Sequence, residues 1–176
     1  MFKNLMESLI KANIKLYGLE DLGLICLYDD DNYSNIDYDF VSNQHRSFLR
    51  SILLNNGWKS KSSRLFIKDN FEVLFPKPTA VLGTDPSDAV SKEMKKDRYI
   101  FCTSSQAFLI MAKKGKWDHQ RACEIVKNCP ANIDKVYQWM NEYKLTSPSK
   151  EQLTEIKKIQ TEGFKKKVLA RKRSGL

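Results

Sequence analysis

Apolar residues recur at helical spacing at the start of the chain and then give way to shorter apolar runs. The helical spacing predicts a first helix over residues 2–17, which Gly18 can end. A continuous apolar run over residues 22–28 predicts a buried strand, and residues 35–41 read as a half-exposed strand. The apolar positions that define the first helix are Phe2, Leu5, Met6, Leu9 and Ile10.

A second helix, a hairpin and a further strand follow. The helix is predicted over residues 42–57, and the hairpin consists of strands at 62–68 and 71–76, joined by a tight turn at the Asp-Asn pair between them. Residues 98–102 form another short apolar strand. The face of the second helix that we expect to be buried carries Phe48, Leu49, Ile52 and Leu53.

The rest of the chain reads almost entirely as helix. Thr103 or Ser104 can cap one of these helices, and Ser149 with Gln152 fits a capping box at the start of the last one. The sequence therefore predicts an α+β fold, with a small mixed sheet in the front half followed by a helical C-terminal half. The predicted helices span residues 84–96, 103–115, 118–128, 132–143 and 147–173.

Two acids stand two residues apart in the predicted strand 35–41. Because side chains i and i+2 of a strand point to the same face, Asp37 and Asp39 would lie together. They form either the solvent-exposed face of a half-buried strand or a site at which both carboxylates bind one divalent cation. Mg²⁺ takes few protein carboxylates, so this pair would suffice as a nucleus. Glu72 is the candidate third carboxylate, and Gly23 is the nearest glycine that could approach phosphates.

Length and composition limit the classes of protein to consider. A chain of 176 residues fits one domain, and it contains no apolar run long enough to span a bilayer. The amphipathic N-terminus lacks the features of a signal peptide. None of the four cysteines forms a Cys-x-x-Cys pair, and the two histidines do not sit at zinc-ligand spacing. We therefore expect buried thiols, no zinc site and a reducing, cytoplasmic setting.

The net charge of +9 is unevenly distributed. Residues 20–39 contain many acids and no Lys or Arg, whereas residues 164–176 are densely basic. A basic end predicts attraction to nucleic acid or another anionic partner, and the alternative is a solvated, frayed helix end. The expected nucleic-acid-binding residues are Lys165, Lys166, Lys167, Arg171, Lys172 and Arg173.

The acidic strand and its surroundings resemble the nucleotidyltransferase-fold proteins of bacterial toxin–antitoxin and abortive-infection systems. In that family a Gly-Gly or Gly-Ser element precedes a strand with Asp-x-Asp. Here Gly23 stands where the second small residue would sit, and Asp37-Tyr38-Asp39 follows. Residues 51–83 are similar to the helix and hairpin of the family. Residues 116–143 are similar to the helical region of a subgroup, through Trp117, Asp118, Gln120, Ala122, Ile133, Asp134 and Trp139.

The chain also departs from the pattern of that family. Leu22 replaces the first glycine of the pair, and no Ser or Thr follows Gly23. The third carboxylate of the family falls on Leu74, two residues after Glu72, which could substitute for it from the same face. The resemblance implies a nucleotidyltransferase-like α/β core over residues 1–103, a helical subdomain over residues 104–147 and a basic C-terminal helix over residues 148–176.

An active member of this family would be a metal-binding and nucleotide-binding enzyme. The resemblance implies that Asp37 and Asp39 hold Mg²⁺ (or Mn²⁺), with Glu72 as a further catalytic carboxylate and Gly23 against the phosphates of an NTP. The enzyme would transfer a nucleotide to a hydroxyl of a protein or an RNA, in a toxin–antitoxin or phage-defence system.

A second interpretation is a catalytically inactive binding protein that uses the same fold and its basic C-terminal helix. The missing Gly-Ser pair favours this version. The expected partners are a cognate toxin or antitoxin protein, or RNA, and no membrane. A third interpretation is a small nucleic-acid-binding protein of unrelated fold, whose binding depends on charge alone.

Overall fold

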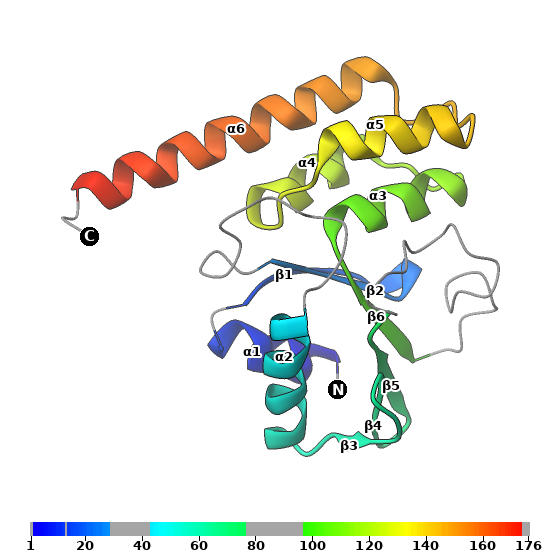
Figure 1. Ribbon diagram of the computed structural model, residues 1–176, viewed down its shortest axis with the longest axis vertical. Coiled ribbons are helices and arrows are strands. Elements are labelled where there is room, and N and C mark those ends of the chain that lie inside the picture. Colours follow the sequence, from blue (N-terminus) through cyan, green and yellow to red (C-terminus); the bar gives the residue numbers. More distant parts are fainter. Residues whose placement is uncertain (1, 13, 29–42, 77–96, 174–176) are drawn as a thin grey trace.

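A mixed β-sheet lies between two layers of helices (Figure 1). The computed structural model describes residues 2–12, 14–28, 43–76 and 97–173, and the statements below concern this part of the chain. The strands are β1 (Lys15–Leu19), β2 (Leu24–Tyr28), β3 (Lys59–Ser60), β4 (Leu65–Lys68), β5 (Phe71–Leu74) and β6 (Arg98–Cys102). The helices are α1 (Phe2–Lys11), α2 (Asn43–Asn55), α3 (Ser104–Lys113), α4 (His119–Asn128), α5 (Ile133–Glu142) and α6 (Lys150–Arg173), with a short 3₁₀ turn η1 at Glu20–Leu22.

The six strands lie in the order β1-β2-β6-β5-β4-β3. β6 runs parallel to both of its neighbours, β2 and β5, whereas all other neighbouring pairs are antiparallel. In the central parallel pair, Leu24 lies opposite Ile100 and Cys26 lies opposite Cys102. The mixed sheet and the helical second half confirm the predicted α+β class.

Both faces of the central strands are buried. Tyr28 and Ile100 face the layer formed by α3, α4, α5 and α6, whereas Ile25, Phe66 and Phe101 face α1 and α2. Strands covered on both faces read as continuous apolar runs, which is why residues 22–28 gave a clear strand signal. The two cysteines of the central pair are free and buried, as is Cys129, which confirms the predicted buried thiols at three of the four positions.

The predicted caps of α3 and α6 form, and a further cap that was not predicted forms at α4. Thr103 caps α3, accepting from the backbone N–H of Gln106, whose side chain accepts in return from the Thr103 N–H. Asp118 caps α4. Ser149 and Gln152 form the same reciprocal pair at the start of α6. Each cap satisfies backbone donors that the helix itself leaves unpaired, so the helix starts coincide with the sequence signals.

The helix predicted over residues 2–17 is wrong in its second half, because α1 ends at Lys11 and residues 15–19 form β1. Pairing with β2 over the whole of β1 outweighs the helical periodicity. Phe48 is 44% exposed, so it does not join the buried face predicted for the second helix, and β3 has no signal in the sequence. The strand predicted at residues 35–41 and the helix predicted at residues 84–96 lie outside the described residues.

The last helix packs along only part of its length. Leu153 and Ile156 are buried against the helical layer, in which α6 contacts α4 and α5. Farther along, Lys165 and Lys166 are exposed and Leu169 is 55% exposed. In Figure 1 the red end of α6 extends beyond the other elements. Within the described residues, no helix combines the length and the apolar character that crossing a membrane requires.

We predict opposite effects from adding a methyl group at two glycines. A Cβ at Gly163, inside α6, or at Gly115, after α3, would meet no atom within 4 Å, but Gly115 has a φ of +63°. Gly163→Ala should favour the helix locally by about 1 kcal/mol and raise helix content in circular dichroism. Gly115→Ala should lower the free energy of unfolding by about 1 kcal/mol, because an L side chain is strained at that φ. A loss of helix content in Gly163→Ala would contradict the helical conformation at that position.

Candidate functional site

The two aspartates predicted to bind metal, Asp37 and Asp39, lie outside the described residues. Glu72, the third predicted carboxylate, lies in β5 opposite Arg98 of β6. Arg98 Nε donates to Glu72 Oε2 at 2.6 Å, and Arg98 Nη2 contacts the same oxygen. The side chains are 22% exposed for Arg98 and 18% for Glu72, so water screens the pair only partly. A metal ion or a reacting group would have to compete with this guanidinium for the carboxylate.

Gly23, predicted to approach phosphates, closes the short turn η1 in the left-handed conformation, with a φ of 60°. Its backbone N–H donates to the carbonyl of Glu20 at 3.0 Å, and its own carbonyl accepts from the N–H of Ile100 at 2.8 Å. The glycine is therefore explained by the turn that leads into β2. A phosphate cradle uses free backbone N–H groups, and the N–H of Gly23 is already engaged.

The N-terminus of α3, which directly follows β6, is another place where backbone N–H groups could hold a phosphate. Protein groups occupy it instead. Ser104 Oγ donates to the carbonyl of Cys129 at 2.7 Å, and Ser105 Oγ accepts from the backbone N–H of Asn132 at 2.8 Å. Both serines are fully buried. These contacts join α3 to the connection between α4 and α5. The polar side chains at the start of α3 are therefore used to pack the helices together.

The predicted nucleic-acid-binding residues all lie in the last part of α6. Lys165 and Lys166 are exposed and have no acidic partner in the part of the chain that the structure describes. For the other four residues only the helical backbone is described: Lys167, Arg171, Lys172 and Arg173. The charge of α6 changes at Gly163. Residues 150–162 contain three basic and three acidic residues, whereas residues 164–173 contain six basic residues and no acid.

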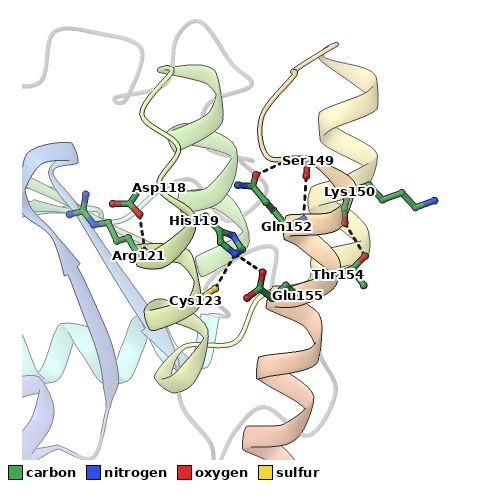
Figure 2. Close-up of polar contacts among 9 residues, drawn as sticks. All are labelled: Asp118, His119, Arg121, Cys123, Ser149, Lys150, Gln152, Thr154 and Glu155. Atoms are coloured by element: carbon green, nitrogen blue, oxygen red, sulfur yellow. Dashed lines mark hydrogen bonds and ion pairs between the residues drawn. The ribbon is translucent and has the colours of Figure 1, made fainter.

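A cluster that was not predicted lies between α4 and α6 (Figure 2). His119 Nε2 lies 2.9 Å from Glu155 Oε2 and 3.7 Å from Cys123 Sγ. The three atoms that could bind a metal lie within 4.8 Å of one another. His119 Nδ1 is buried and has no hydrogen-bond partner among the described residues. The arrangement brings a nitrogen, a sulfur and a carboxylate oxygen to one point.

The sequence contains a signal for part of this cluster. His119 and Cys123 are four residues apart in a predicted helix, which places them on one face. This spacing is neither a Cys-x-x-Cys pair nor a pair of histidines, the two patterns that usually indicate a zinc site. Glu155 follows His119 by 36 residues, and only the packing of α6 on α4 brings it close.

The electrostatics of the cluster do not favour a cysteine nucleophile. Such a nucleophile needs a lowered pKa, so that the thiolate is present at neutral pH. Burial raises the pKa of Cys123, and the negative charge of Glu155 raises it further. Without a bound cation, Cys123 is therefore a neutral thiol beside an imidazole.

A groove of about 290 Å³ lies between α5 and α6. Its floor is apolar, formed by Ile133 and Leu153, and Tyr137 lines one side. Lys157 Nζ donates to Asp134 across it, at 2.7 and 2.9 Å from the two carboxylate oxygens. Of the predicted site residues whose side chains the structure describes, none lines this groove.

Comparisons of the chain with protein-family models, with curated proteins and with solved structures gave no match. The resemblance to the nucleotidyltransferase fold therefore stays a prediction, and function has to be argued from the chemistry of the described residues.

We predict that Glu72 and Arg98 are coupled energetically. A double-mutant cycle of Glu72→Gln and Arg98→Met should give a coupling free energy of about 1–2 kcal/mol in urea unfolding, because a partly buried charged hydrogen bond is lost. Additive effects of the two substitutions would show that Glu72 does not depend on the guanidinium and is available for other chemistry.

We predict a pH-dependent contribution from Asp21, whose carboxylate accepts from Arg121 Nη2 at 2.6 Å. The hydrogen bond from Arg121 lowers the pKa of Asp21 below its usual 3.8. Because the pKa is lower in the folded protein, the ionised carboxylate stabilises the fold at pH values above its usual pKa. This contribution is lost as the pH falls through the lowered pKa. Asp21→Asn should therefore lower the free energy of unfolding at pH 7, by under about 1 kcal/mol because Asp21 is half exposed. The difference should shrink as the pH falls through the lowered pKa of Asp21 and vanish below it.

The control for this prediction is an Arg121→Met background. Without the guanidinium, Asp21→Asn should have no effect on the free energy of unfolding at either pH. A difference that persists at pH 7 in this background would assign the effect to another partner of Asp21.

Proposed function

We propose that the protein binds RNA through the basic half of α6, residues 164–173. The observation that carries this proposal is the change of charge at Gly163, from balanced in residues 150–162 to wholly basic in residues 164–173. The end of α6 that carries this charge extends beyond the other elements (Figure 1). Charge on a packed helix can serve the fold. On the projecting end, Lys165 and Lys166 are exposed and have no acidic partner among the described residues.

Six basic residues in ten make a strong attraction for a chain of phosphates. Residues 164–173 contain no Asn, Gln, Ser or Thr, so the contacts they offer are mainly to phosphates and not to base edges. Basic segments of this kind are suited to RNA, because they become ordered when they bind it. We expect binding that depends strongly on salt and weakly on base sequence.

The basic half of α6 should also respond to its ligand. Lys167 and Arg171 are one helical turn apart, and like charges at this spacing weaken an isolated helix. A projecting helical segment is marginal in water without packing. Phosphates would remove the repulsion, so RNA binding should increase the helix content of residues 164–173.

A second candidate function is nucleotide transfer from an NTP to a hydroxyl of a protein or RNA, in a toxin–antitoxin or phage-defence system. The sequence Asp37-Tyr38-Asp39, which follows the central strand β2, supports it. The engagement of Glu72 with Arg98 and of the Gly23 N–H with Glu20 favours the binding protein over the enzyme. Incubation with Mg²⁺ or Mn²⁺ and each labelled NTP distinguishes them: transfer of label that Asp37→Asn abolishes would establish the enzyme.

We predict that neutralising part of the basic half of α6 reduces the salt dependence of RNA binding. In the variant Lys165→Gln, Lys166→Gln, Lys167→Gln, the slope of log K against log salt should fall by about two, because each lost contact to a single strand removes about 0.7. Anisotropy of a labelled single-stranded RNA at several salt concentrations measures the slope.

The matched control carries the same change of charge elsewhere on the surface. Lys11 lies in α1, Lys59 in β3 and Lys61 just after β3, and all three are exposed. In Figure 1, α1 and β3 lie away from α6. Replacing these three with Gln should leave the slope unchanged. Equal slopes for both triple variants would remove α6 from the proposal, and tighter binding to duplex DNA than to RNA would correct the class of nucleic acid.

A further inference from the structure

We propose that His119, Cys123 and Glu155 form a binding site for Zn²⁺ that joins α4 to α6. The cluster is separate from the predicted Mg²⁺ site at Asp37 and Asp39, and it does not depend on RNA binding by α6. The structure brings three ligands of suitable type together from two helices (Figure 2).

The two distances from His119 are close to those around a tetrahedral ion, and the Cys123 and Glu155 ligand atoms lie within 4.8 Å of each other. Bonds of about 2.0–2.1 Å to nitrogen or oxygen and about 2.3 Å to sulfur place ligand atoms roughly 3.3–3.6 Å apart. The His119 Nε2 to Cys123 Sγ distance is 3.7 Å. The His119 Nε2 to Glu155 Oε2 distance is 2.9 Å, as expected for a hydrogen bond that the ion would replace. A side-chain shift of about half an ångström at Glu155 would open the required space.

The ligand types select the metal. A thiolate and an imidazole with one carboxylate suit a borderline ion such as Zn²⁺, whereas Mg²⁺ and Ca²⁺ prefer oxygen ligands. Cys123 would lose its thiol proton to solvent as the Zn–S bond forms. Three protein ligands would leave a fourth position for water.

Contacts that involve no metal already fix the two backbones that present the ligands. Asp118 caps α4 by accepting from the N–H of Arg121 at 3.0 Å, and Arg121 is paired with Asp21. Ser149 and Gln152 cap the start of α6, one turn before Glu155. The ligands are therefore held near one another before the ion binds, which lowers the entropy cost of binding.

Two features set the strength of the site. Glu155 is 61% exposed and His119 is 27% exposed, so an ion can enter from solvent. His119 Nδ1 has no partner among the described residues, and a second hydrogen bond on the imidazole normally orients a ligand histidine and strengthens it. We therefore expect a weaker site than a structural zinc centre with four protein ligands.

Cobalt provides a direct test, because a thiolate bound to Co²⁺ gives a charge-transfer band in the near ultraviolet. The full chain, freed of metal with EDTA and kept in a phosphine reductant, should show this band with one equivalent of Co²⁺, and Zn²⁺ should abolish it. Cys123→Ser should lose the band. Glu155→Gln should weaken Co²⁺ binding about tenfold or more.

The matched control is Glu162→Gln, which removes a carboxylate from an exposed position two turns farther along α6 and should leave Co²⁺ binding unchanged. Zn²⁺, but not Mg²⁺, should raise the unfolding temperature of the native chain and of this control. The absence of a band at excess Co²⁺, or a band that survives in Cys123→Ser, would overturn the proposal. Glu155 is exposed, so its variant tests the site even if Cys123→Ser does not fold.

Discussion

Four consecutive polar residues, 103–106, are buried at the point where β6 becomes α3, and their hydrogen bonds fix the start of α3 and join it to the connection between α4 and α5. A buried polar group without a partner costs about 1–3 kcal/mol, so each of these side chains constrains what lies beside it. The capping pair within this segment fixes the start of α3. Ser104 and Ser105 bind the connection between α4 and α5. Because α3 follows β6 directly, these contacts place the connection between α4 and α5 beside the carboxyl end of β6.

Internal contacts of this kind also occupy groups that could otherwise bind phosphate or a metal ion. The N-terminus of α3 and the turn at Gly23 are two places where backbone N–H groups could hold phosphate, and both are occupied by contacts within the protein. Glu72 is likewise engaged by Arg98. Among the described residues, exposed basic groups without such contacts lie on several elements, and the last part of α6 is one of them. Lys165 and Lys166 are examples, because they lie past the part of α6 that packs.

Local signals in the sequence predicted the capped starts of α3 and α6, because a cap rests on contacts within a few residues. The capping pair of Ser149 and Gln152 is an example. Signals failed where distant pairing decided the outcome. Residues 15–19 continue the helical pattern of α1, yet they form a strand because β2 pairs with all five of them. The cluster at His119 could be predicted only in part, since its third member comes from a separate helix.

The two halves of α6 are governed by different physical constraints, and Gly163 separates them. The first half is fixed by apolar packing at Leu153 and Ile156 and by the contact of Glu155 with His119. A metal at that contact would hold the first half of α6 more firmly. It would not affect residues 164–173, because α6 is about 36 Å long and these residues lie beyond the packed turns. Glycine inside a helix costs about 1 kcal/mol relative to alanine. Gly163 is therefore the position at which the proposed RNA-binding part of α6 would adjust to its ligand while the packed part keeps its contacts.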